Sequence, residues 1–323
     1  MSRRAPYIVG WVVLTGLVIA TARRVDWTLA LSATLEAKPL PLIIAVLLNA
    51  MILVFATAQW LLFLPQGVSV AKSKMFEIMA LTSTVSNSGP VGGGAAVGLH
   101  LLATHGGVGH SVGLSVLLLD QLIEGLAKMA IVLLAIAAVP IGLEYRTVGA
   151  TIILGVPILM LALTVTAHRR RVLASISERT TGFWGWILRT LNRVADNLEA
   201  LRQPKKLSVT VVLALLQKLV EALAIASVLM AFGISTPWWG VLAVLVAVNL
   251  STVVSVTPAN LGVYEGAAFL VYRALGVGSD TAVALAIVQH VVYLIPLAGI
   301  GWIISSVRPL RVNRTDLDLD ASS

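Results

Sequence analysis

Long apolar stretches separated by short polar segments dominate the chain. Six of them approach or exceed the ~20 residues that a helix needs to cross the hydrocarbon layer, and they cover about 7–22, 40–64, 111–139, 148–167, 207–232 and 281–307. Two further apolar segments, 75–104 and 239–275, are interrupted in the middle by glycine, proline and polar residues. The pattern predicts an all-α polytopic membrane protein with six long transmembrane helices and two broken re-entrant hairpins. Each broken segment is also long enough for two full spans, and both alternatives give an even number of crossings.

The two interruptions share one spacing of helix-breaking residues. In both, a proline is followed by glycine four and eight residues later. The residues are Pro90, Gly94 and Gly98 in the first interruption and Pro258, Gly262 and Gly266 in the second, and each matching pair is 168 residues apart. With 26 glycines in 323 residues, a proline would meet this spacing by chance only about once in 150, so a duplication is the better explanation. Breaks at matching positions of two halves indicate a transporter binding site.

The duplication also predicts how the two halves are oriented. Each half holds three unbroken spans, and an odd number of crossings inverts the second copy relative to the first. We assign the first repeat to 1–167 and the second, which begins with the span at about 148, to 148–307, with a basic loop at 168–206 and a disordered tail at 308–323. The two breaks are then expected to meet near the midplane and line a polar cavity, because lipid does not tolerate unpaired backbone groups.

Composition and charge support a membrane protein and indicate its orientation. The chain is 58% hydrophobic and 12% charged, with a mean hydropathy of +0.94, which is more apolar than a soluble domain. The net charge is +8, and most basic residues lie between the spans. The positive-inside rule predicts that the loop 168–206 and both termini are cytoplasmic. We expect a multi-pass protein of the plasma (inner) membrane. The same distribution argues against nucleic acid as a partner.

The residues at the two breaks are the first candidates for a substrate site. Free amides at the starts of the returning half-helices carry partial positive charge, which favours an anionic group such as phosphate. The candidate cavity residues are Asn87, Gly89, Pro90, Gly93, Gly94, Thr257, Pro258, Asn260, Gly262 and Glu265. Glu265 adds a charge where the first copy has Val97. Alternatively the glycines only allow close helix packing, the role that we expect for Gly98 and Gly266.

Ionisable residues inside the apolar spans are the second group of candidates, because a charge at the bilayer centre costs roughly 2.5–3.5 kcal/mol. They are Asp120, Glu124, Lys128, Lys218, Glu221 and His290. The first three lie at i, i+4 and i+8 on one helical face, and Lys218 and Glu221 form an i, i+3 pair. His290 could take part in proton coupling. The alternative interpretation is a structural ladder of ion pairs within the bundle.

Several kinds of chemistry have little to build on in this sequence. The chain has no cysteine, and none of its five histidines forms an H-x-x-x-H pair, so we expect no metal site. Neither a P-loop nor a G-x-S-x-G motif is present. We therefore expect no cofactor and no enzymatic activity.

Two motifs resemble those of a known family. The run TPANLGVYEGA is similar to the P-G-x-L-G-x-x-E signature of the lysylphosphatidylglycerol synthase transmembrane, or flippase-like, family. SGPVGGGAAVGL, with LLLDQLIEGLA after it, resembles the earlier segments of that family. The likeness covers about 40–307 and implies a lipid flippase domain with paired re-entrant hairpins. Because the aminoacyltransferase domain of fused members is not in this sequence, we expect no lipid synthesis.

The resemblance also implies roles for individual residues. Pro258, Gly262 and Glu265 would form the functional tip of the second hairpin. The first tip would be formed by Pro90 and Gly94, and the acidic helix would carry Asp120 and Glu124. The chain departs from the family pattern at four positions, where charges or a glycine are replaced: Ala95, Gly98, Gln121 and Ala259.

The leading hypothesis is a lipid flippase that moves an anionic or lipid-linked headgroup between leaflets through the midplane cavity. Its partner would be a membrane lipid, anionic or phosphate-bearing, and homo-oligomerisation is left open. One alternative is a secondary transporter of a small organic anion. Another is a membrane-embedded enzyme that modifies lipids with Asp120, Glu124 and His290 as acid and base.

Overall fold

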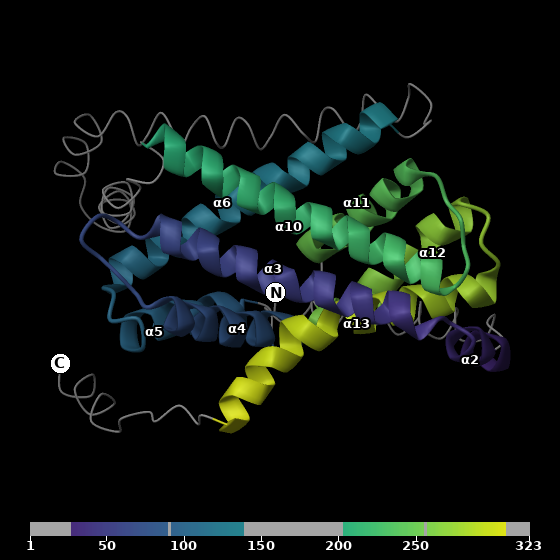
Figure 1. Ribbon diagram of the computed structural model, residues 1–323, viewed down its shortest axis with the longest axis horizontal. Helices are drawn as coiled ribbons and strands as arrows, with labels where there is room; N and C mark the ends of the chain where they lie inside the picture. Colours follow the sequence, from purple (N-terminus) through teal and green to yellow (C-terminus); the bar gives the residue numbers. More distant parts are fainter. Residues whose placement is uncertain (1–26, 90–91, 139–202, 255–256, 308–323) are drawn as a thin grey trace, which may run out of the picture.

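The computed structural model describes residues 27–89, 92–138, 203–254 and 257–307, and every regular element among them is helical. The first part of the chain forms α2 (Trp27–Leu35), α3 (Pro39–Phe63), α4 (Lys72–Ser88), α5 (Gly93–Thr104) and α6 (His110–Ala138). The second part forms α10 (Pro204–Ala231), α11 (Trp238–Val254), the short 3-10 helix η2 (Pro258–Asn260), α12 (Val263–Ala274) and α13 (Ser279–Val307) (Figure 1).

Four of the described helices, α3, α6, α10 and α13, are long and apolar enough to cross a membrane. They coincide with four of the six predicted spans. The other two, 7–22 and 148–167, lie outside the described residues, as do residues 168–202 of the predicted basic loop at 168–206 and the tail at 308–323. Helix α2 was not predicted and packs against α13. The protein is therefore an all-helical membrane protein with several apolar helices.

Both predicted breaks interrupt the helices at the expected places. Gly92 precedes α5 and Gly262 precedes α12, each with φ 80°, a conformation that glycine adopts without a Cβ penalty. The two helices that flank each break pack against each other and form a helical hairpin, α4 with α5 and α11 with α12. In each hairpin the first helix has 17 residues and the second has 12. Both numbers are below the ~20 residues that span the hydrocarbon layer.

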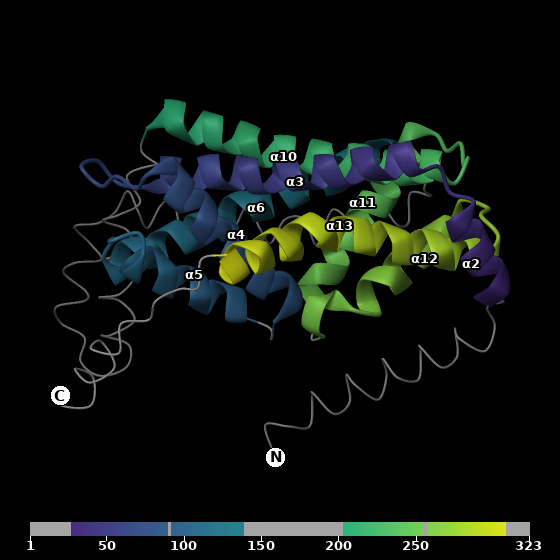
Figure 2. The same ribbon diagram turned by 60° about the horizontal axis from the view of Figure 1, so that its bottom comes forward.

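The two sets of helices correspond in length and in packing. α6 and α13 both have 29 residues, and the hairpin arms match as well. The packing of α3 on α4 recurs between α10 and α11, and that of α4 on α13 recurs between α11 and α6. Helices α3 and α10 lie side by side (Figures 1 and 2). The Lys38 N–H donates to the Ala231 carbonyl at 2.9 Å, so the start of α3 meets the end of α10 and the two run antiparallel.

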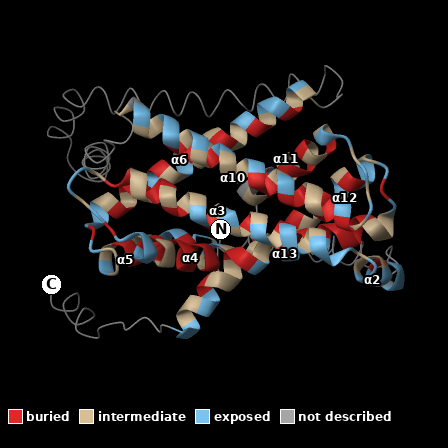
Figure 3. Ribbon diagram, viewed as in Figure 1, coloured by how far each residue is buried: buried red, intermediate tan, exposed pale blue. Residues whose placement is uncertain are grey.

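The buried core forms two large clusters, and both draw on helices of the two halves. One lies mainly between α3, α4, α5 and α6, includes Trp60 and Leu119, and extends to Leu297 of α13. The other lies mainly between α10, α11, α12 and α13, includes Leu245, and extends to Ile131 of α6. Exposed residues occur along α3 and α10 (Figure 3). They include the large apolar residues Leu40, Leu47, Val212 and Leu219. Such residues suit lipid, because lipid tails are as apolar as leucine.

Helix α13 approaches α4 closely at Gly301. A Cβ at this position would lie 2.6 Å from the carbonyl oxygen of Ala80. Nearby, the hydroxyls of Ser83 and Thr84 donate to the α13 carbonyls of Leu297 and Ala298 at 2.8 and 2.7 Å. The lack of a side chain at Gly301 therefore allows the first hairpin to bond directly to the α13 backbone.

We expect Gly301→Ala to lower the free energy of unfolding by about 1–3 kcal/mol, the usual cost of overpacking. Gly299→Ala is the matched control, because a Cβ there meets nothing within 4 Å. Thermal unfolding of both purified variants in detergent measures the difference. Equal shifts for the two variants would show that the close contact between α4 and α13 is not what restricts position 301.

Candidate functional site

A cavity of about 200 Å³ lies between α3, α4, α6, α10 and α13. It is several times larger than the ~30 Å³ that one water molecule takes in the liquid. Its charged lining residues are Asp120, Glu124, Lys218 and Glu221. Amides and hydroxyls come from Gln59, Thr82, Ser83, Ser86, Asn87, Gln121, Gln217 and Tyr293. Ser86 and Gln121 are exposed, so the cavity is not sealed within the bundle.

The acidic face of α6 supplies one wall of the cavity. Asp120 and Glu124 lie one turn apart, so both can face the same side of the helix. Glu124 forms an ion pair with Lys128 at 2.8 Å. Lys128 lies outside the lining and also donates to the hydroxyl of Thr252, on α11, at 3.4 Å. The pair therefore connects the cavity wall to α11, the first arm of the second hairpin.

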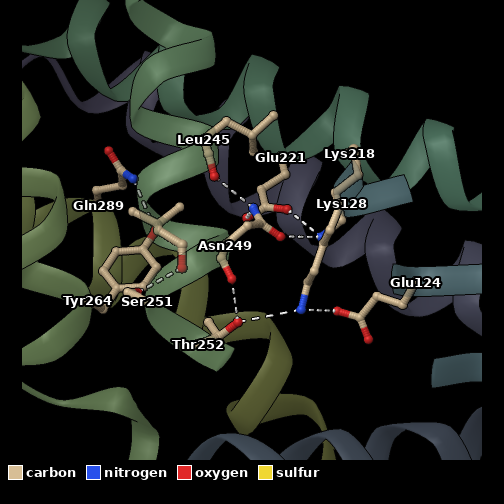
Figure 4. A network of polar contacts seen from close by, with 11 residues as sticks. Glu124, Lys128, Lys218, Glu221, Leu245, Asn249, Ser251, Thr252, Tyr264 and Gln289 are labelled. Atoms are coloured by element: carbon tan, nitrogen blue, oxygen red, sulfur yellow. Dashed lines mark hydrogen bonds and ion pairs between the residues drawn. The ribbon is translucent and has the colours of Figure 1, made fainter. Parts of the chain in front are cut away.

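On α10, Lys218 and Glu221 form a closed polar network with Asn249 of α11 (Figure 4). Lys218 Nζ lies 3.0 Å from Glu221 Oε2 and 2.7 Å from Asn249 Oδ1, and Asn249 Nδ2 donates to Glu221 Oε1 at 2.9 Å. The lysine and glutamate side chains are only 12% and 9% exposed. A buried ion pair is tolerated when further hydrogen bonds satisfy both partners, and Asn249 provides them.

Asp120 differs from the other charged lining residues. Among the described residues it has no ion-pair partner, and its neighbours include the side chains of Trp60 and Gln121. The lining as a whole carries three carboxylates and one ammonium. An acidic cavity of this kind attracts positively charged groups and repels anions.

A second polar cluster lies at the tip of the other hairpin, where Glu265 bonds in two directions. Its Oε2 accepts from the Gly262 N–H at 2.7 Å, and its Oε1 lies 2.8 Å from Nδ1 of His290 on α13. This helix start, which the sequence indicated as favouring an anion, is therefore occupied by a carboxylate of the protein itself. Glu265 instead attaches the start of α12 to α13.

Three further polar side chains complete this cluster, and all three are buried. Tyr264 stacks on His290, with ring centroids 4.2 Å apart and an interplanar angle of 13°. Gln289 donates to the Tyr264 hydroxyl at 3.0 Å and accepts from the Tyr272 hydroxyl. Figure 4 shows Gln289 pointing towards Tyr264. We had not predicted the tyrosines, because an aromatic residue in an apolar stretch is usually core.

The first hairpin contributes to the cavity through the C-terminal end of α4. Asn87 lines the cavity and donates to the Ser83 carbonyl at 2.8 Å. Gly89, Gly93 and Gly94 are not part of the lining. Instead, Gly94 packs so closely on Ser86 that a Cβ would lie 2.8 Å from the serine Cβ. Pro90 lies outside the described residues.

The second break reaches the first hairpin but not the cavity. η2 packs against α4, so the second interruption lies beside the first arm of the other hairpin. Its residues Thr257, Pro258, Asn260 and Gly262 are nevertheless absent from the lining, as are Glu265 and His290. Thr257 is buried, and its hydroxyl donates to the Leu261 carbonyl at 3.0 Å. The second tip therefore lies beside α4 without lining the cavity.

Backbone strain is concentrated at this second tip. Ala259 and Asn260 have φ of 56° and 55°, in the left-handed region that asparagine tolerates and alanine rarely adopts. Ala259 stands where the resembled family has glycine. The backbone at this position is in the left-handed region that glycine adopts readily, although the residue here is alanine. Among the paired glycines, Gly98 packs against Thr82 and Trp60 as expected, whereas Gly266 faces open space.

Comparison with known proteins identifies the family of the chain. A family model described as the lysylphosphatidylglycerol synthase TM region matches residues 7–301. No curated protein matches the chain. The matched range includes both hairpins, the residues that line the cavity and the two polar clusters. The chain therefore belongs to the family of the lysylphosphatidylglycerol synthase TM region.

Proposed function

We propose that this protein moves a lipid between the two leaflets of the membrane and that the headgroup passes through the cavity described above. The observation that carries the proposal is a charged cavity inside a bundle whose outer faces are apolar. A polar headgroup crosses hydrocarbon only at high cost, and the cavity offers it polar partners. Acyl chains can stay in the surrounding lipid. Membership of a lipid-related membrane family supports the same function.

The proposal includes an inverted repeat with two re-entrant hairpins. It is supported by the equal lengths of α6 and α13 and of the matching hairpin arms, by the antiparallel packing of α3 and α10, and by the contact between η2 and α4. Transporters of this architecture alternate access by rocking one repeat against the other around a central site. On this proposal the protein lies in the plasma membrane with both termini in the cytoplasm.

The charge of the lining supports a headgroup that carries an ammonium group. A phosphate in the cavity would face three carboxylates and one lysine, and the amide at the start of α12 already binds Glu265. An ammonium group could bind Asp120, which has no ion-pair partner among the described residues. We therefore propose a cationic or zwitterionic headgroup in place of the anionic group indicated by the sequence.

Reconstitution into vesicles tests the proposal. We expect the purified protein to accelerate leaflet exchange of fluorescent phosphatidylethanolamine at least tenfold over protein-free vesicles, and by more than it accelerates phosphatidylglycerol. The reason is that only the first lipid offers an ammonium group to the acidic lining. A membrane-impermeant quencher reports how much label has changed leaflet. No acceleration for either lipid would exclude lipid transport.

The same vesicles distinguish the two alternatives. Uptake of a soluble organic anion without lipid exchange would indicate a secondary transporter. A chemically new lipid would indicate an enzyme that uses Asp120, Glu124 and His290. The geometry disfavours this enzyme, because His290 is only 3% exposed, is bonded to Glu265 and lies outside the cavity lining.

A further inference from the structure

The open cavity has a counterpart in the second half of the bundle, and that counterpart is filled. The numbering of α6 and α13 differs by 169, so Asp120, Gln121 and Glu124 correspond to Gln289, His290 and Tyr293. The three α6 residues line the cavity. Gln289 and His290, at the matching positions, are each only 3% exposed. Two neighbouring positions of the duplicated helix therefore line the cavity in one half and are buried in packed contacts in the other.

The side chain of Tyr264 fills the counterpart. It extends from the first turn of α12, accepts a hydrogen bond from Gln289 at 3.0 Å and stacks on His290. The corresponding residue in the first hairpin, 168 positions earlier, is Ala96. Alanine has no side chain long enough to occupy the equivalent space. The difference between an open and a filled site thus corresponds to a difference in side-chain size at one duplicated position.

Tyr264 is also connected to the wall of the open cavity. Its ring centroid lies 6.0 Å from that of Tyr293, and Tyr293 lines the cavity. The next residue, Glu265, binds His290 and so attaches the same turn of α12 to α13. A displacement of this turn would break both contacts with His290 and would remove the ring that packs on Tyr293. The two sites therefore share one wall.

We propose that Tyr264 is a gate that occupies a second headgroup site and leaves it when the open cavity closes. The inference rests on the proposed transport function, since alternating access requires that the two sites are not open together. Withdrawal of Tyr264 would expose the amide of Gln289 and the imidazole of His290. These groups would bind the same polar headgroup on its way to the other leaflet.

Two cysteine reporters test the gate, because the chain has no cysteine of its own. Ser86→Cys reports on the open cavity and Gln289→Cys on the filled counterpart. In vesicles treated with a membrane-impermeant maleimide, we expect Ser86→Cys to react at least tenfold faster. We expect Gln289→Cys to react from the opposite side of the membrane. Reaction of both from the same side would overturn the proposal.

The double variant then measures whether the two sites are coupled. A bulky maleimide attached first at Ser86→Cys should keep the cavity from closing and slow the reaction of Gln289→Cys at least threefold. An unchanged rate would show that Tyr264 is only a core residue. If the coupling appears without lipid exchange, the gate stands and lipid is not the cargo. If lipid exchange occurs without coupling, the transport function stands and the gate does not.

Variants of Tyr264 provide a second measurement. Tyr264→Ala should accelerate labelling of Gln289→Cys at least tenfold, because the plug is removed. Tyr264→Phe keeps the ring and should change the rate less than threefold. Equal acceleration by the two variants would contradict a steric gate. If Tyr264→Ala does not fold, the coupling measurement with Tyr264 intact still decides the question.

Discussion

Replacing Glu221 with glutamine is expected to lower the free energy of unfolding by about 3–5 kcal/mol, the range typical when one partner of a buried ion pair is removed. The ammonium of Lys218 would lose the carboxylate that lies 3.0 Å away, at a site where its side chain is only 12% exposed. Glutamine offers one acceptor oxygen where the carboxylate offers two, so it can no longer accept from Lys218 and Asn249 on separate oxygens. Chemical or thermal unfolding of the variant in detergent measures the change.

A double variant separates the cost of leaving Lys218 unpaired from the net contribution of the ion pair. Lys218→Met combined with Glu221→Leu removes both charges, and we expect it to recover much of the loss, because apolar replacements of a buried pair are often neutral. Lys72→Met is the control for loss of an exposed charge, which contributes at most about 1 kcal/mol. A double variant that is less stable than Glu221→Gln would contradict the argument.

Asp120→Asn is expected to reduce lipid exchange by roughly tenfold to a hundredfold while changing stability little. A hydrogen bond to a charged group contributes about 1.5–3 kcal/mol, and an asparagine cannot balance the charge of an ammonium group. Asp120 has no ion-pair partner among the described residues, so its replacement leaves no cation of the protein unpaired. Leaflet exchange and thermal unfolding are measured on the same preparation.

The matched control for Asp120 is Glu77→Gln, which removes an acid of α4 that does not line the cavity. It should leave lipid exchange within about twofold of the unmodified protein, since an acid outside the cavity offers the headgroup no contact. If both variants lose exchange equally, the effect is one of overall charge rather than of the cavity. If Asp120→Asn unfolds the protein, Asp120 is structural and the binding role is excluded.

The two polar clusters divide the buried charges into different roles. Lys218, Glu221 and Asn249 satisfy one another and stabilise the contact between α10 and α11. Glu265 and His290 hold the start of α12 against α13. Asp120 alone among the charged lining residues is left without an ion-pair partner in the described part of the chain. This unequal satisfaction is why stability and transport are expected to respond to different substitutions.

The sequence by itself determined the features that depend on neighbouring residues. Apolar length predicted the four described spans. The glycines and prolines predicted where the hairpins break, because Gly92 and Gly262 adopt positive φ that other residues avoid. Helical spacing also predicted the pairs Glu124 with Lys128 and Lys218 with Glu221, since residues three or four apart meet on one face.

Only the tertiary structure decided which side chains from distant helices meet. Glu265 and His290 are 25 residues apart, and Asn249 reaches Lys218 across 31. The position of the cavity depends on how five helices are rotated about their axes. A helix that is apolar on nearly all sides marks no inward face in its periodicity, so these rotations could not be read from the pattern. The packing of each helix on its neighbours sets these rotations. The rotations in turn decide that the site at Asp120 is open and that its counterpart is filled by Tyr264.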